Sequence, residues 1–191
     1  MQLIRFASLQ ATPWKNGGGI TRQLLIQPPA ANLDNFTLRV SIADVDSDGP
    51  FSDFSGIDRS LGLLAGNGLA LFEAGASIAT LQAGGPLFEF DGGRAISSQR
   101  SAGKVQDFNV MTRRGAASHQ TRRLTLQGTQ PLQTDGPTLL LLAAGDTLQV
   151  AAGNEPQTLG RWDALWLDAP AALQLTAAQP CELIVVAVQF A

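Results

Sequence analysis

A glycine-dense segment near the N terminus, residues 13–19, places an indole, a cation and an amide side by side. Lys15 and Asn16 can donate hydrogen bonds to an anion, and Trp14 can form an apolar wall. The three glycines that follow let the backbone approach a ligand or another strand where a Cβ atom would clash. A tight turn with the indole as a core plug is the alternative. The segment is therefore a candidate binding element or an ordinary turn.

A second stretch, residues 36–42, alternates apolar and polar side chains with a period of two. In a strand this pattern places Arg39 and Ser41 on one face and the apolar residues on the other. The polar face then points either to solvent or into the interior of a barrel. An arginine fork inside a barrel is suited to binding a carboxylate through two parallel hydrogen bonds.

A third stretch, residues 107–113, shows the same alternation. Asn109 shares a face with Asp107 and Met111, a combination that is unusual for a surface exposed to water. Two interpretations remain open, namely a pocket lining and a buried amide that is fully hydrogen-bonded.

The acidic segment at residues 44–55 imitates a calcium-binding loop, with acids at its first, third and fifth positions and a glycine at its sixth. Its twelfth position is Ser55, whereas a calcium loop requires a glutamate there. We therefore predict a turn, with Phe51 and Phe54 anchoring the segment onto a core.

Composition excludes several classes of function. The chain has one histidine (His119) and one cysteine (Cys181), which is too few for a metal centre of several histidines, so we expect no metal and no cofactor. A single cysteine forms no intrachain disulfide, which favours a cytoplasmic location. The net charge of −3 and the absence of a long apolar run give no reason to expect a nucleic-acid or membrane partner.

Short apolar runs interrupted by Gly, Pro, Asn and Asp predict an all-β fold. Residues 61–71 resemble residues 140–150 in sequence, at an offset of 79 residues. In each copy, two apolar runs are separated by a glycine turn, which predicts a β-hairpin. This echo predicts a cupin-type double-stranded β-helix duplicated in tandem, a bicupin. We expect an N-terminal lobe at residues 1–115 and a C-terminal lobe at 116–191, packed as one compact unit with strand exchange.

Three stretches together resemble the HutD/Ves family in order and spacing over residues 1–115. They are residues 13–22, residues 39–61 and residues 107–114. One departure is Gln23, where the family commonly has an acid. The resemblance implies a bicupin without a catalytic metal. It also implies a link to histidine utilisation, with a regulator that binds a metabolite such as urocanate or formylglutamate, or, in the Ves branch, a link to environmental stress.

The residues and the resemblance together lead to a main hypothesis of a non-enzymatic sensor that binds a small carboxylate in its N-terminal lobe and has no catalytic residues. Its expected ligand-binding residues are Trp14, Lys15, Asn16, Arg39, Ser41, Phe51, Arg59, Asn109 and Met111. Two alternatives stay open. One is a metal-independent enzyme that uses Asp107 or Asp48 with Lys15 as acid and base. The other is an assembly protein, for which a homodimer through the apolar final strand is one option.

Overall fold

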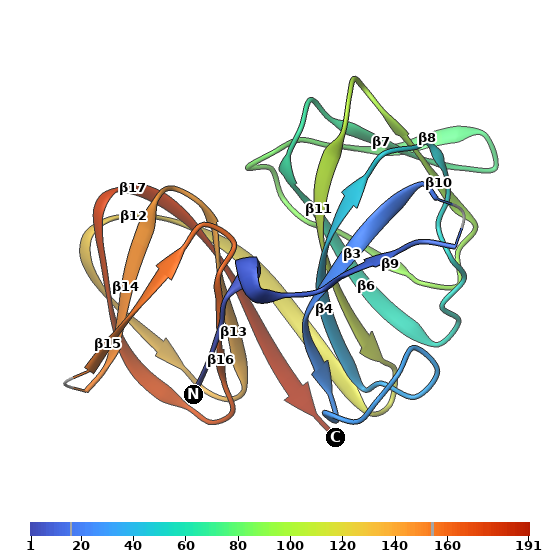
Figure 1. Cartoon of the computed structure of the whole chain (residues 1–191). Coiled ribbons are helices and arrows are strands. Elements are labelled where there is room, and N and C mark those ends of the chain that lie inside the picture. The colour runs from blue at the N-terminus through green and yellow to red at the C-terminus, as the bar shows by residue number, and fades with distance from the viewer. Residues whose placement is uncertain (16, 154) are drawn as a thin grey trace. The chain divides into compact units, whose positions relative to one another are not determined.

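The computed structural model describes residues 1–15, 17–153 and 155–191. The chain is built from β-strands, with one short 3₁₀ helix, η1 (Phe6–Ser8), which confirms the all-β prediction. It divides into two compact units (Figure 1). We call residues 10–118 with Ala191 the N-terminal lobe, and Met1–Leu9 with His119–Phe190 the C-terminal lobe.

The first nine residues thus belong to the C-terminal lobe, whereas the sequence placed them in the N-terminal one. The reason is β1 (Gln2–Ile4), which pairs antiparallel with β16 (Ala164–Leu167) and brings Ile4 opposite Ala164. A strand so far in sequence from its neighbour carries no local signal of its partner.

The N-terminal lobe contains two sheets. One has six strands in the order β2-β3-β4-β11-β6-β9, and the other has four in the order β5-β10-β7-β8. The bounds in the first sheet are β2 (Ala11–Pro13), β3 (Gly19–Gln27), β4 (Leu38–Val45), β11 (Val105–Arg113), β6 (Ile57–Ala65) and β9 (Phe88–Asp91). Those in the second are β5 (Gly49–Pro50), β10 (Ile96–Arg100), β7 (Leu69–Glu73) and β8 (Ala76–Leu81).

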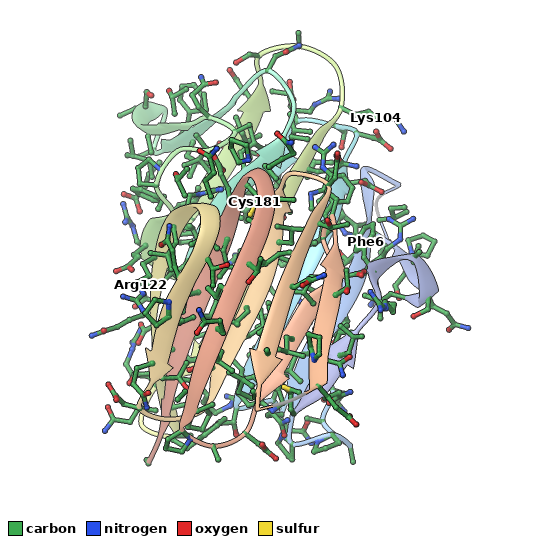
Figure 2. The ribbon with its side chains drawn as sticks, turned by 90° about the vertical axis from the view of Figure 1, so that its left-hand side faces the viewer. Phe6, Lys104, Arg122 and Cys181 are labelled. Atoms are coloured by element: carbon green, nitrogen blue, oxygen red, sulfur yellow. The ribbon has the colours of Figure 1, made fainter. Side chains whose placement is uncertain are left out.

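The C-terminal lobe is a seven-stranded sheet in the order β1-β16-β13-β17-β14-β15, with β12 paired to β17. The remaining bounds are β12 (Ala117–Thr134), β13 (Thr138–Ala144), β14 (Thr147–Ala152), β15 (Glu155–Gly160) and β17 (Ala171–Phe190). Cys181 is buried in the core of this lobe and Arg122 is exposed on β12 (Figure 2).

The two lobes repeat the same strand pairings, as the echo in the sequence suggested. β6 pairs with β9 and β11, and its counterpart β13 pairs with β16 and the second half of β17. β7 pairs with β8 and β10, and β14 pairs with β15 and the first half of β17. Even a β-bulge recurs, after Leu63 in one lobe and after Leu142 in the other.

The predicted hairpins at these glycine turns are wrong. β6 and β7 belong to different sheets, and β13 and β14 pair with other strands rather than with each other. The turns at Gly66 and Gly145 therefore carry the chain out of one pairing and into another. Both glycines have positive φ, and a Cβ atom would lie 2.7 Å from Val105 at Gly66 and 2.6 Å from Cys181 at Gly145.

The face of the six-stranded sheet that packs toward the four-stranded sheet is called the inner face. Ala43, Leu61 and Leu63 on this face join one core cluster with Leu69 and Leu71 of the opposite sheet. The alternating strands predicted at residues 36–42 and 107–113 are present, with the polar set of each on the inner face.

The repeat shows that the inner face of the N-terminal lobe is polar at positions where the other lobe is apolar. Asp107 lies opposite Leu63 in the pairing, and the counterpart pair is Leu183 opposite Leu142. Asn109 likewise corresponds to Val185. Leu183 and Val185 belong to a wholly apolar core cluster. The polar residues of the N-terminal lobe are therefore not a requirement of the fold.

Candidate anion-binding site

The register of three neighbouring strands brings the polar residues of the inner face into rows. Met111 of β11 lies opposite Arg39 of β4 on one side and opposite Arg59 of β6 on the other. The next row holds Ser41 and Asn109, and the row after it holds Asp107. We call Arg39, Ser41, Arg59, Asp107, Asn109 and Met111 the polar cluster.

Arg59 is 5% exposed and is surrounded by aromatic rings. Its guanidinium carbon lies 4.8 Å from the ring centre of Phe90, 5.3 Å from that of Phe51 and 5.6 Å from that of Phe54. These contacts are cation–π interactions, which stabilise a guanidinium that has lost its water. Its Nε has no hydrogen-bond partner among the described residues. Burial lowers the pKa of Arg59 to about 10, so the side chain is still a cation at neutral pH.

Arg39 is partly buried beside the neutral side chain of Gln23. Its Nε donates to Gln23 Oε1 at 3.2 Å, and its Nη1 lies 3.7 Å from Met111 Sδ. Burial lowers the pKa of Arg39, and the charge of Asp107 partly offsets that effect. Within the described residues, neither Arg39 nor Arg59 forms an ion pair in contact with a carboxylate.

Asp107 is 5% exposed and is the acid of the polar cluster. Burial raises its pKa to about 7, against the opposing effects of Arg59, a backbone hydrogen bond from Ala43, and Arg39. Asp44 adds a smaller repulsion that raises the pKa further. The carboxyl group therefore changes charge near neutral pH, far above the ordinary range for aspartate.

Within the polar cluster, the side-chain amide of Asn109 also has a polar atom without a described partner. Its Oδ1 is buried and accepts no hydrogen bond from any described residue. A buried polar atom without a partner costs about 1–3 kcal/mol, so its retention needs a reason. Arg59 Nε, noted above, is a second such atom in the same rows of the sheet. Both are explained if a polar ligand contacts this face.

The glycine-dense segment is a turn held to the sheet by its backbone. Trp14 N donates to Gly19 O, and Gly18 O accepts from the backbone N–H groups of Asp46 and Ser47 at 2.8 and 3.1 Å. The indole of Trp14 donates to Thr21 Oγ1 at 2.7 Å. A Cβ atom on Gly19 would clash with the carbonyl oxygen of Asp44, so this glycine permits the approach of another strand.

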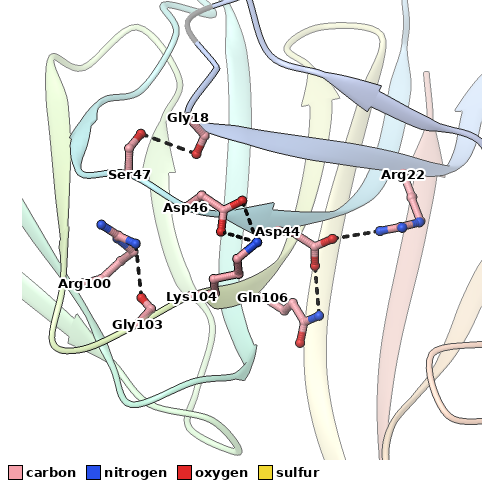
Figure 3. Close-up of polar contacts among 9 residues, drawn as sticks. All are labelled: Gly18, Arg22, Asp44, Asp46, Ser47, Arg100, Gly103, Lys104 and Gln106. Atoms are coloured by element: carbon pink, nitrogen blue, oxygen red, sulfur yellow. Dashed lines mark hydrogen bonds and ion pairs between the residues drawn. The ribbon is translucent and has the colours of Figure 1, made fainter.

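The acids at the first, third and fifth positions of the rejected calcium loop are held in ion pairs, and Figure 3 shows those of Asp44 and Asp46. Asp44 accepts from Arg22 and Gln106, and Asp46 forms an ion pair with Lys104. Asp48 accepts from Arg100, which lowers the pKa of its carboxyl group. Within the described residues, no group of three or more His, Cys, Asp or Glu side chains could hold a metal ion. These acids therefore fasten the loop to its neighbours.

The structure brings together most of the residues singled out from the sequence. Arg39, Ser41, Arg59, Asn109 and Met111 lie in adjacent rows of the inner face, Phe51 covers Arg59, and Trp14 packs in the core cluster of the same face. Lys15 is exposed in the turn, and no described contact joins it to the polar cluster. Asn16 lies outside the described residues.

Four residues were missed as ligand-binding candidates. Asp107 was weighed only as the acid of an enzyme, although it shares the face of Asn109 in the alternating pattern. Gln23 was noted only as a departure from the family, and Phe54 only as an anchor. Phe90 carried no signal, because β9 reaches Arg59 through non-local pairing.

Comparison with known proteins assigns the chain to a family. A family model described as HutD matches residues 6–185. The chain belongs to the HutD family. It is 34% identical over 174 residues to an uncharacterized 21.2 kDa protein in the hutC 3′ region of Pseudomonas putida, covering 88% of this chain and 87% of the relative. It is 33% identical to protein Ves of Citrobacter koseri over 123 residues, covering 64% of this chain and 63% of Ves.

Solved structures agree with this assignment. A conserved protein of unknown function from Pseudomonas aeruginosa PAO1 is 28% identical, with a TM-score of 0.90 and 98% of each chain covered. HutD from Pseudomonas fluorescens SBW25 is 26% identical, with a TM-score of 0.79 and the same coverage. A cupin 2 conserved barrel protein from Leptotrichia buccalis is 12% identical, with a TM-score of 0.64 over 98% of this chain and 96% of that one. The predicted cupin fold and HutD/Ves resemblance are confirmed, and the family links the chain to histidine utilisation.

Proposed function

We propose that this protein is a non-enzymatic regulatory protein that binds a small carboxylate of histidine utilisation, such as urocanate or a formylglutamate-like acid, on the inner face of its N-terminal lobe. One observation carries the proposal. Arg39 and Arg59 are two desolvated cations in one row of the sheet, and no described carboxylate contacts either of them.

The charge of the polar cluster supports an anionic ligand. Two guanidinium groups face one carboxyl group whose pKa is about 7, so the cluster carries a net positive charge at neutral pH. An uncompensated buried charge costs several kcal/mol, and a bound carboxylate would remove much of that cost. The unpartnered Arg59 Nε offers a donor to the ligand carboxylate, and the unpartnered Asn109 Oδ1 offers an acceptor to an N–H group such as that of formylglutamate.

The surroundings of the cluster favour a small ligand with an apolar part. Phe51, Phe54, Phe90 and Met111 present apolar surface beside the guanidinium groups. Binding sites for small molecules combine such surface with a few placed polar groups. HutD from Pseudomonas fluorescens was solved in a formate condition, and formate is the smallest carboxylate.

A metal-independent enzyme is a second candidate, and Asp107 is the observation that favours it. A buried carboxyl group whose pKa lies near 7 can both accept and donate a proton at neutral pH, as a general acid–base catalyst must. This candidate differs from the first in one outcome, because a catalyst consumes the acid that it binds.

A thermal-shift screen against urocanate, histidine, formylglutamate, glutamate and formate tests the proposal. At a hundredfold excess over Kd, a ligand stabilises the native state by about 2.7 kcal/mol, which raises the Tm of a chain of this size by a few degrees. We expect a selective shift that Arg39→Met abolishes, while the exposed control Arg122→Met retains it. NMR of the recovered acid separates binding from turnover. A panel without any shift contradicts the proposal.

A further inference from the structure

Asp107 and the ligand proposed above depend on the same two cations. Asp107 lies two rows from Arg39 and Arg59 on the same three strands, and both arginines act on its charge. Yet no described ion pair joins Asp107 to either guanidinium. A carboxylate that binds to the arginines therefore weakens the attraction that stabilises an ionised Asp107.

The other charged groups near Asp107 do not replace that attraction. From β4, Asp44 repels it, although Arg22 of β3 and Gln106 of β11 hold the Asp44 side chain. From β3, the group that contacts Arg39 is the neutral amide of Gln23. From β6, the facing residue is Leu63. In the other lobe, the position of Asp107 is occupied by Leu183, an uncharged residue in an apolar core.

On the basis of the proposed carboxylate binding, we propose that the site takes up one proton, on the Asp107 carboxylate, when it binds a carboxylate above neutral pH. This step conserves protons and charge. A proton from solvent joins the Asp107 carboxylate, the ligand carboxylate enters, and the arginines keep two positive charges against one negative charge. The protonated carboxyl group then has an O–H that can donate a hydrogen bond, whereas the ionised group could only accept.

Linkage fixes the direction of the pH dependence. Near and below pH 6, Asp107 is already protonated in the free protein, so the affinity for the carboxylate does not change with pH. Above pH 7 the protein takes up a proton as it binds, so Kd rises with pH, by at most about tenfold per pH unit while the bound site stays protonated. The protein would thus bind its acid more tightly in a more acidic medium.

Isothermal titration of the full chain with formate and with formylglutamate tests this coupling. Neither probe has a group that titrates between pH 5.5 and 8.5. At pH 8, titrations in Tris and in triethanolamine count the protons, because the heats of ionisation of these two amine buffers differ. We expect an uptake of about half a proton or more at pH 8 and almost none at pH 5.5.

Two variants assign the proton. Asp107→Asn removes the titrating group, so its affinity for the carboxylate should be constant from pH 5.5 to 8.5. Asp168→Asn, at an exposed acid of the C-terminal lobe, should keep the wild-type dependence. If Asp107→Asn does not fold, the buffer comparison on the wild-type chain still decides whether a proton is taken up.

The outcomes separate the inference from the function on which it rests. Binding with no proton uptake and level affinity in the wild-type chain overturns the inference and leaves carboxylate binding intact. Uptake that persists in Asp107→Asn overturns the assignment to Asp107. No binding of either acid at any pH overturns the proposed function and the inference together.

Discussion

Asp107 makes the stability of the protein depend on pH in an unusual direction. Its folded-state pKa of about 7 lies above the value of 3.8 for an unperturbed aspartate, so the native state holds a proton that the unfolded state releases between these values. Stability from this group is therefore complete below about pH 4 and is lost as pH rises through 7. The full loss is on the order of 4 kcal/mol.

Asp107→Asn should remove this loss. We expect the variant to gain stability relative to the wild-type chain as pH rises from 4 to 8, as measured by urea unfolding at several pH values. Asp48→Asn is the matched control, because the pKa of Asp48 is lowered by its hydrogen bonds with Arg100. If the two variants follow the same pH profile, Asp107 is not the group responsible.

Gln23 sets the charge beside Arg39, because its amide oxygen accepts from Arg39 Nε. Gln23→Glu would supply the counter-ion that Arg39 lacks and would compete with a ligand carboxylate. We expect a roughly tenfold weaker affinity for formylglutamate by isothermal titration, with no loss of stability. Gln120→Glu, at an exposed position of the C-terminal lobe, controls for the added charge. Unchanged affinity in Gln23→Glu would exclude Arg39 as a ligand contact.

At the level of single residues, the sequence predicted which side chains share a face of a strand better than it predicted which residues lie opposite them on neighbouring strands. Alternation alone placed Arg39 with Ser41, and Asn109 with Met111, because side-chain direction in a strand depends only on the period of two. It could not show that Met111 lies between Arg39 and Arg59, because the pairing of β4, β11 and β6 is non-local. Lys15 was expected in the site from proximity to Trp14 in the sequence, yet the turn leaves it exposed.

The start of β3 has no room for a side chain at Gly19. Gly19→Ala would place a Cβ atom against the carbonyl oxygen of Asp44 and 3.2 Å from the Trp14 indole. We expect a loss of about 1–3 kcal/mol in the free energy of unfolding, as for other overpacked positions. Gly136→Ala is the control, since its Cβ atom would meet only the Val188 carbonyl at 3.8 Å. Equal stability of the two variants would contradict this close approach.

The N-terminal segment is fastened to the C-terminal lobe by Asp163. Its carboxylate accepts from Phe6 N at 2.9 Å, from Gly160 N at 3.0 Å and from Arg5 Nη1 at 2.6 Å. Asp163→Ala leaves these donors without their acceptor and should cost about 1–3 kcal/mol in urea unfolding. Asp168→Ala, at an exposed acid, should have little effect. A small effect of Asp163→Ala would mean that the pairing of β1 with β16 suffices.

Elements were predicted more reliably than their connections. The strands around Gly66 and Gly145 were correctly located, since apolar runs ended by glycine are a local signal. The hairpins were wrong because a short glycine turn fits both a hairpin and a crossing between sheets, and only long-range pairing distinguishes the two.

At the scale of the whole chain, two copies of one strand plan differ in polarity at matching positions of their sheets. At two of these positions the C-terminal copy has the apolar side chains of Leu183 and Val185, which belong to its core cluster. The N-terminal copy places Asp107 and Asn109 at the same positions and adds Arg59 in place of Thr138. The comparison indicates that one lobe keeps the stable core while the other carries a costly polar cluster suited to a ligand.

The most direct test of carboxylate binding is a crystal structure of the full chain with the acid that gives the largest thermal shift. We predict a carboxylate on the inner face, within about 3 Å of guanidinium nitrogens of both Arg39 and Arg59. A ligand bound at Lys15 or in the C-terminal lobe, with both arginines still without an anion, would contradict it.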